Sequence, residues 1–440
     1  MFISVLSNGR TETDSLSETT QKYLRRNYLL GLLNGATFNF VEALLDPALV
    51  LTWFVSQLTS SHFLIGLVVP ISTGVALLPQ LLFADFLERQ ERKLPLYQTT
   101  AVVRGLSWFL LFLSLFFLGQ DSNLLLVAFF SLFTLSNLAA GPAALAFMDV
   151  VGKVIPARRR GSFFGARLFI GGMLAVGGSL IVRYILDERS GLPFPRNYAM
   201  LFLIYFLGAS AGMASFCLVV EPANQARAVR ISFLGQLVRA WDMVRNNANY
   251  RFYLIAALAL TATDVAASFY IVYAKNVLGA SGAMVGVYLT VYTASSVLSN
   301  LVWGWLNDRR GSVLVIRTSC LIALCAPAFT LASGPLTHLP RISKEAALYL
   351  FTLIFALFGA FKIGRFMGIS NFILDLAPSQ ERPMYLGLTN TMQGLVLFGA
   401  ASGGLIVDIS GLETVFYIAL AFCLIASFLS LCLKEPRDGE

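Results

Sequence analysis

The stretch Leu348–Leu376, LYLFTLIFALFGAFKIGRFMGISNFILDL, decides the fold of this chain. As an α-helix it is long and apolar enough to cross the ~30 Å hydrocarbon core of a bilayer. Two cations, Lys362 and Arg365, lie well inside it. An unpaired cation at that depth costs several kcal/mol, so we expect Lys362 to face a protein interior or a water-filled cavity and to have an acidic partner. The stretch therefore predicts a bundle of membrane-spanning helices around a polar cavity.

The composition of the whole chain agrees with this prediction. Hydrophobic residues make up 57% of the 440 residues and charged residues only 13%, whereas a soluble domain carries about 25% charged residues. We therefore predict an all-α polytopic membrane protein that lies in a lipid bilayer. The five cysteines have no metal-site spacing, and His62 and His338 lie in predicted loops, so we expect neither a metal nor a cofactor.

Short polar or basic breaks divide the apolar sequence into twelve predicted helices. These helices cover residues 28–57, 63–84, 97–119, 124–151, 163–186, 198–219, 252–274, 283–306, 313–334, 346–374, 384–408 and 413–433. The longest break divides them into two equal sets. The predicted parts of the chain are a polar, disordered tail (1–27), an N-terminal six-helix bundle (28–219), a linker (220–251), a C-terminal six-helix bundle (252–433) and a second tail (434–440).

The linker carries its own pattern. Ile231–Val244 has apolar residues at helical spacing with arginines beside them, which is typical of an amphipathic helix at a membrane surface. A plain tether between the two bundles is the favoured reading, and a regulatory or lipid-sensing role is the alternative.

Lys and Arg are distributed unequally over the two sides of the predicted membrane. Most fall in the tails, the linker and the breaks on the same side as the termini. The positive-inside rule therefore predicts an integral protein of the plasma (inner) membrane with both termini in the cytoplasm. This distribution also explains the net charge of +8 without a nucleic-acid partner. The basic residues on the other side are Arg183, Arg189, Arg196, Lys275, Arg341 and Lys344.

An internal repeat relates the two halves. Several landmarks recur in the same order at a slowly drifting separation, which predicts duplicated, pseudo-symmetric six-helix bundles. Repeat-built transporters have their substrate site at the repeat interface near the bilayer midplane. The matching pairs are Glu42 with Asp264, Asp85 with Asp308, Asp149 with Asp375, Gly161 with Gly387, and Gly177-Gly178 with Gly403-Gly404.

The segment Gly304–Gly311, GWLNDRRG, resembles G-x-L-x-D-R-x-G, the signature of the loop between helices 8 and 9 in the major facilitator superfamily. The same place in the first half, Leu82–Lys93, keeps Asp85 and the final Arg-Lys but lacks the early Gly and Arg. Through span count, repeat and loop length, the resemblance covers essentially the whole chain. It implies two six-helix bundles that rock around a central cavity.

The signature also implies a gate. A carboxylate near the cytoplasmic end of one helix can meet an arginine and the positive N-terminus of a neighbouring helix, and so hold the bundles together when the cavity faces outward. Asp149 and Asp375 each precede a basic segment and suggest a second pair of latches. Ordinary loop charge and helix-end solvation are the alternatives. The gating candidates are Asp85, Arg89, Asp308, Arg309, Gly304, Gly311, Asp149 and Asp375.

Other ionisable residues lie deep in the spans. Glu42 and Asp264 are each roughly 20 Å from the cytoplasmic end of their predicted helices. Asp46 is one turn beyond Glu42, and the following proline breaks or bends the helix. Arg104 and Arg167 lie nearer the cytoplasmic ends, where snorkelling explains them. We expect substrate binding or proton coupling from Glu42, Asp46, Asp264, Lys362 and Arg365, with fixed interhelical salt bridges as the alternative.

Together these features predict a secondary active transporter that moves a small solute by alternating access, coupled to protons. A monomer suffices, because each half supplies the partner of the other. One alternative is an exporter of amphipathic compounds or lipids, which the Phe-rich spans favour. Another is a non-transporting receptor or assembly factor. We predict no enzyme, because the sequence has no Ser/His/Asp or Cys/His cluster and no phosphate-cradling loop.

Overall fold

The computed structural model describes residues 18–119, 121–223, 242–336, 343–378 and 381–439. Within these ranges the chain is helical and contains no strand. Most of the linker helix predicted at Ile231–Val244, and residues 1–17 of the predicted disordered tail, lie outside them.

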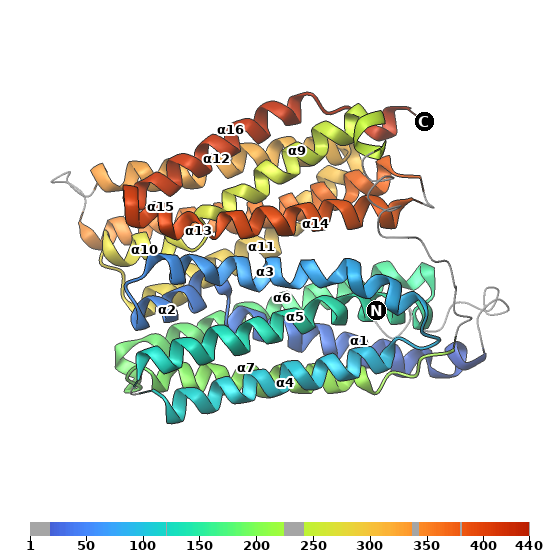
Figure 1. Cartoon of the computed structure of the whole chain (residues 1–440), viewed down its shortest axis with the longest axis horizontal. Helices are drawn as coiled ribbons and strands as arrows, with labels where there is room; N and C mark the ends of the chain where they lie inside the picture. Colours follow the sequence, from blue (N-terminus) through green and yellow to red (C-terminus); the bar gives the residue numbers. More distant parts are fainter. Residues whose placement is uncertain (1–17, 120, 224–241, 337–342, 379–380, 440) are drawn as a thin grey trace.

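Each half of the chain forms a bundle of antiparallel helices (Figure 1). The N-terminal half consists of α1 (Glu18–Leu44), η3 (Pro47–Leu51), α2 (Thr52–Leu58), α3 (His62–Glu88), α4 (Leu94–Phe117), α5 (Ser122–Val154), α6 (Ala157–Leu186), η4 (Glu188–Ser190) and α7 (Arg196–Cys217). The C-terminal half consists of α9 (Ala248–Ala262), η5 (Thr263–Ala266), α10 (Phe269–Asn276), α11 (Gly282–Arg310), α12 (Ser312–Leu336), α13 (Lys344–Leu376), α14 (Arg382–Ala400), α15 (Gly403–Ser410), α16 (Leu412–Leu431) and η6 (Pro436–Gly439).

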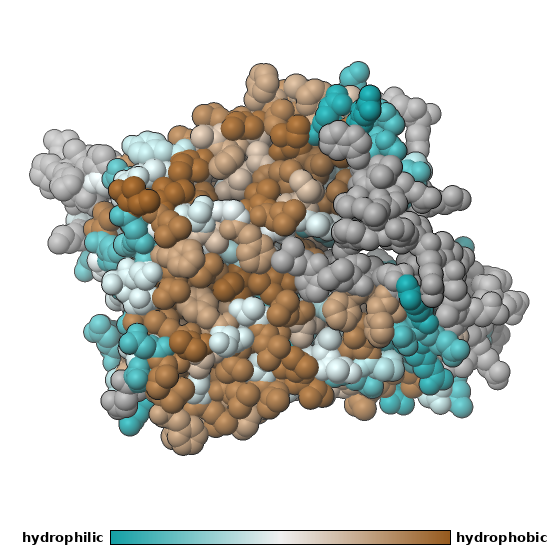
Figure 2. Space-filling view, viewed as in Figure 1, coloured by the Kyte–Doolittle hydropathy of each residue, from teal (hydrophilic) through white to brown (hydrophobic). Residues whose placement is uncertain are grey.

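The predicted spans are confirmed. Eleven described stretches are long and apolar enough to cross a membrane, and α3, with its apolar stretch His62–Leu77, completes the expected twelve. Figure 2 shows a broad apolar surface over the helices, with hydrophilic residues gathered at the two ends of the molecule. The first helix begins at Glu18, before its predicted start at residue 28. Its polar first turns are anchored to the end of α7, where Asn27 exchanges hydrogen bonds with the backbone of Val220.

The first span of each half is broken near its middle. In the N-terminal half, Asp46 Oδ1 accepts hydrogen bonds of 3.0 Å from the backbone N–H groups of Ala48 and Leu49, and Pro47 occupies the first position of the next turn. Proline suits that position because it has no N–H to leave unbonded. In the C-terminal half, the equivalent break is the 3-10 turn Thr263–Ala266 between α9 and α10. These breaks follow Glu42 and surround Asp264, the pair that the repeat had aligned.

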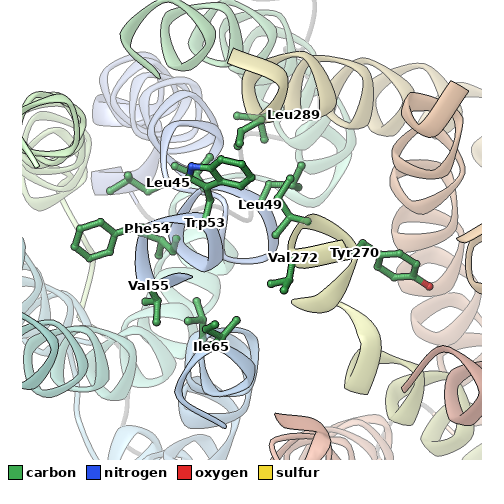
Figure 3. Packing of buried hydrophobic residues seen from close by; sticks show 14 of the residues in the cluster. Leu45, Leu49, Trp53, Phe54, Val55, Ile65, Tyr270, Val272 and Leu289 are labelled. Atoms are coloured by element: carbon green, nitrogen blue, oxygen red, sulfur yellow. The ribbon is translucent and has the colours of Figure 1, made fainter. Parts of the chain in front are cut away.

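The two halves pack together at one end of the molecule. The start of α1 and the end of α16 lie at the same end, here called the terminal end, and the opposite end is the distal end (Figure 1). One hydrophobic core joins both halves on the distal side, whereas two further cores on the terminal side each belong to a single half. Figure 3 shows the centre of the shared core. This distal cluster consists of Leu45, Leu49, Trp53, Ile65, Val272 and Leu289.

Two glutamates at the terminal end occupy equivalent places in the two halves, and they were not identified from the sequence. Glu221, just after α7, accepts hydrogen bonds from the backbone N–H groups of Lys93 and Leu94 at the start of α4, and lies 2.7 Å from Lys153 Nζ. Glu435, just after α16, accepts from the N–H of Val313 at the start of α12 (2.9 Å). Each glutamate is followed by proline and links the end of its bundle to a helix start inside the same half.

Replacing Glu221 with alanine leaves the start of α4 uncapped and Lys153 buried without its partner. Breaking a buried ion pair costs about 3–5 kcal/mol, whereas losing a helix cap alone costs about 0.5–2 kcal/mol. In the described residues no cation lies within ion-pair distance of Glu435, so Glu435→Ala is the matched control. In thermal unfolding of the purified protein in detergent, we expect the larger fall in Tm for Glu221→Ala. Equal falls would contradict the ion pair.

Candidate functional site

A cavity of about 680 Å³ lies between the two halves. The N-terminal half contributes most of its wall, and α11 and α13 contribute the rest. The distal cluster closes it on one side. On the other side it reaches toward the terminal end, along α6 and α11, to residues such as Gly165 and Leu301. The charged side chains among the lining residues are Glu42, Asp46, Arg104 and Lys362.

Glu42 and Arg104 share a tyrosine on the N-terminal wall. The Glu42 side chain is exposed to the cavity, and the Tyr205 hydroxyl donates a 3.0 Å hydrogen bond to its Oε1 atom. The Arg104 guanidinium lies near the same hydroxyl and 4.9 Å from the centroid of the Phe38 ring. Its Nε atom is buried, with no hydrogen-bond partner among the described residues. Assigning Arg104 to snorkelling was therefore wrong, because the side chain points inward to the cavity.

Lys362 faces the cavity from the C-terminal half, as predicted, but has no direct ion pair. Its ammonium lies 5.5 Å from the centroid of the Tyr292 ring, and it interacts electrostatically with Asp46. In the described part of the chain, no carboxylate is within ion-pair distance of Lys362 or Arg104. Asp46 is itself buried and uses one carboxylate oxygen to cap η3. The acidic group nearest in role to the expected partner of Lys362 is therefore Asp46, which acts on it at a distance and forms no direct ion pair with it.

Asp264 pairs with the other cation of α13. The Arg365 guanidinium donates two hydrogen bonds to the carboxylate, Nη1 to Oδ1 at 3.2 Å and Nη2 to Oδ2 at 3.0 Å, and a third to the Leu260 carbonyl at 3.0 Å. Neither side chain lines the cavity. Of the residues expected to bind substrate or protons, Glu42 and Lys362 therefore line the cavity, whereas Asp264 forms a two-point ion pair with Arg365 inside the C-terminal half.

The proposed gate residues lie at the terminal end, and the described contacts of Arg309, Gly311, Asp149 and Asp375 stay within one half. Asp308 is exposed, and the Arg309 guanidinium lies 5.0 Å from the centroid of the Trp305 ring in its own helix. Gly311 has a positive φ of 83°, and a Cβ atom there would meet the Glu435 carboxylate, so glycine is required. Gly304 has open space around it, Arg89 is exposed, and the side chain of Asp85 lies outside the described residues.

Asp149 and Asp375 have partners other than the basic segments that follow them in the sequence. Asp149 lies 3.9 Å from Lys93 Nζ, and Asp375 accepts a 3.0 Å hydrogen bond from Arg437 Nε. Both contacts stay within one half. The neighbouring arginine Arg382 instead donates to the carbonyl of Ala377, close to its own helix start.

The described polar contacts between the halves lie at the distal end. His62 Nδ1, at the start of α3, is 2.7 Å from Asp408 Oδ1 of α15. Lys275 Nζ of α10 donates to the backbone oxygen (2.8 Å) and hydroxyl (3.0 Å) of Ser56 in α2. Gly404 lies directly against the backbone of the first turn of α3. From the sequence, we expected His62 in a loop and Lys275 on the side of the membrane away from the termini, and neither contact was predicted.

Comparison with known proteins supports a shared fold. Residues 252–440 match the family model of the Major Facilitator Superfamily. No curated protein matches the chain. Among solved structures, a D-xylose–proton symporter is similar with a TM-score of 0.69 at 13% identity, over 94% of this chain and 99% of that chain. The nucleoside transporter NupG gives 0.66 at 14% identity, over 93% and 99%.

A bacterial homologue of the iron transporter ferroportin is also similar. Its inward-facing structure gives a TM-score of 0.62 at 15% identity, over 94% of this chain and 98% of that chain. Its outward-facing structure gives 0.54 at the same identity. At these identities the likeness concerns the fold. The family match of the C-terminal half and the fold of the whole chain agree: residues 252–440 resemble the Major Facilitator Superfamily, and the chain as a whole has the fold of these solved transporters, two six-helix bundles around an interface cavity.

Proposed function

We propose that this transporter moves a small solute across the plasma membrane by alternating access, as a monomer, and couples that movement to protons through Glu42. The observation that carries the proposal is a charged cavity at the interface of two bundles whose shared hydrophobic core, among the described residues, lies on the distal side. With both termini in the cytoplasm, as the basic residues indicate, the cavity faces inward. In the opposite state the distal contacts would part and the terminal gate candidates would meet.

Glu42 is the best candidate for the proton site. It faces the cavity, it accepts one hydrogen bond from Tyr205, and no cation among the described residues lies within ion-pair distance of it. A carboxylate in that setting can exchange a proton with water in the cavity. Asp264 has both oxygens bound by Arg365, so its role is to hold α13 against the broken first span of the C-terminal half.

The coupling role of Glu42 is testable in proteoliposomes that report internal pH. When pools of anionic, neutral and cationic solutes are added outside, we expect one class to drive proton flux. Glu42→Gln should lower that flux at least tenfold, because glutamine cannot bind the proton, while solute exchange at equal pH continues. Glu188→Gln, an exposed carboxylate in the distal loop, is the control. Flux that persists in Glu42→Gln but disappears in Asp264→Asn would assign coupling to the other carboxylate.

The structural role of Asp264 is measured by a double-mutant cycle. Asp264→Ala leaves the largely buried Arg365 with the Leu260 carbonyl but no carboxylate, and breaking a buried ion pair in this way costs up to about 3–5 kcal/mol. Adding Arg365→Ala should recover much of that loss. Cys320 and Cys423 are buried in the core of the C-terminal half, so labelling by a thiol-reactive dye during heating reports its unfolding. Additive effects of the two substitutions would exclude a stabilising ion pair.

Distal closure depends on close backbone approach at Gly404. A leucine there would collide with the backbone of His62 and Phe63, so Gly404→Leu should shift the protein toward the state open at the distal end. An impermeant maleimide added from that side should label a cysteine placed at Leu289, in the distal cluster, several-fold faster. Gly177→Leu is the control, because nothing lies within 4 Å of a Cβ atom at Gly177. Unchanged labelling in folded Gly404→Leu protein would refute this closure.

A second candidate keeps the fold and changes the cargo. The cavity wall between α6 and α11 is apolar, with Leu168, Phe169, Leu298 and Leu301 among its residues. This wall favours an exporter of amphipathic compounds or lipids. Competition by lysolipids for the proton-driving solute would support this candidate, and indifference to them would remove it.

A further inference from the structure

We infer, on the basis of the proton-coupled transport proposed above, that the solute is a small monoanion. It would be held between Arg104 of the N-terminal half and Lys362 of the C-terminal half, and it would cross with one proton bound to Glu42. The cavity of about 680 Å³ lies within the range of pockets that hold small organic molecules.

The two cavity cations have capacity for an anion. Both line the cavity, and in the described residues neither has a carboxylate within ion-pair distance. The Nε–H of Arg104 is buried without a partner, and Lys362 is exposed to the cavity. A guanidinium matches a carboxylate geometrically, and an ammonium supplies a compact second charge.

The two cavity carboxylates, by contrast, already have partners. Asp46 Oδ1 is bound by two backbone N–H groups, and Glu42 Oε1 is bound by the Tyr205 hydroxyl. Arg104 and Lys362 also have tyrosine neighbours, Tyr205 and Tyr292, but the buried Nε–H of Arg104 has no acceptor among the described residues and is available to an anion. Arg167, behind the wall, favours an anion further. Its guanidinium lies 4.4 Å from the Phe147 ring centroid, and its buried Nη1 has no hydrogen-bond partner among the described residues.

Charge balance links the anion to the proton. With both carboxylates ionised, the charges of Glu42, Asp46, Arg104 and Lys362 cancel in the empty cavity. A proton on Glu42 leaves one excess positive charge, and a monoanion restores neutrality. An uncompensated charge is costly in a low-dielectric interior. The empty carrier and the carrier loaded with both ions are therefore the forms able to change state, which makes transport electroneutral, one anion with one proton.

The groups around Glu42 fit this order of events. Tyr205 of α7 and Arg104 of α4 face it from its own half, and Lys362 of α13 and Tyr292 of α11 line the opposite wall. Protonation of Glu42 removes the negative charge nearest the Tyr205 hydroxyl, and so leaves Arg104 free to attract the solute. Because Arg104 and Lys362 belong to different halves, the bound anion joins them and favours the state in which the cavity is occluded.

The test uses matched solutes in proteoliposomes with a pH dye inside. D-Galacturonate, D-galactose and D-galactosamine share a ring and differ in charge, and D-gluconate, shikimate and L-lactate extend the monoanion set. We expect proton uptake with at least one monoanion, absent with galactose and galactosamine. Imposing a membrane potential with potassium and valinomycin should change the rate by less than about twofold, because the step is electroneutral.

Variants connect the response to the proposed clamp. Arg104→Gln and Lys362→Gln should each raise the half-saturating concentration of the active anion at least tenfold, and Arg104→Lys should recover part of the loss at Arg104. Arg189→Gln, an exposed cation in the distal loop, should leave it unchanged. The Arg104→Lys rescue separates an electrostatic role from simple loss of folding, which thermal unfolding checks independently.

The outcomes separate the two proposals. Glu42-dependent proton flux driven by galactose or galactosamine, but by no monoanion, would overturn the substrate class and retain proton-coupled transport. Anion-driven flux that depends strongly on membrane potential would overturn the one-to-one stoichiometry. No response to any monoanion overturns the substrate class, and no response to any solute of any charge in folded protein overturns the proposed function as well.

Discussion

Charged side chains inside a bilayer must be paired, hydrogen-bonded or hydrated, and this requirement organises the interior of the protein. Asp264 and Arg365 meet it by pairing with each other through two hydrogen bonds. Asp46 meets it by capping the turn after the break in the first span. Arg104 and Lys362 have tyrosine neighbours, Tyr205 and Tyr292, but no carboxylate within ion-pair distance among the described residues, and they line the cavity, where water or a solute can reach them. The cavity therefore exists where the internal pairing is incomplete.

The same requirement explains how far the sequence predicted the fold and the site. Apolar periodicity and the repeated acidic and glycine landmarks were enough for twelve spans in two bundles, because span length depends only on local composition. Pairing inside the membrane depends on how each helix is rotated about its own axis, because that rotation decides which side chains face one another. Lys362 and Arg365 are three residues apart on one helix, and no local signal distinguishes the one that meets Asp264 from the one that faces the cavity.

Two features could not have been predicted from the sequence, because both depend on contacts between distant segments. Glu221 and Glu435 are equivalent because each accepts a hydrogen bond from the backbone at the start of a helix in its own half. The capped residues lie far away in the sequence, so the structure is needed to find this equivalence. Arg104 was assigned to the membrane surface because of its position along α4. Its position against Phe38 and Tyr205 follows from the packing of α4 against α7, which also packs against α1, and distance along a helix does not report that direction.

The two ends of the molecule are built from different interactions, and this difference suits alternating access. The distal end is closed by apolar packing around Trp53, with two polar contacts at its edge, His62 with Asp408 and Lys275 with Ser56. The described ion pairs at the terminal end all lie within one half, so separating the halves there breaks none of them. Opening the distal end exposes apolar surface, and that loss must be offset by new contacts at the terminal end. In the proposed cycle, exposed charges such as Asp308 and Arg309 would supply such contacts, and a neutral, loaded cavity would lower the remaining barrier.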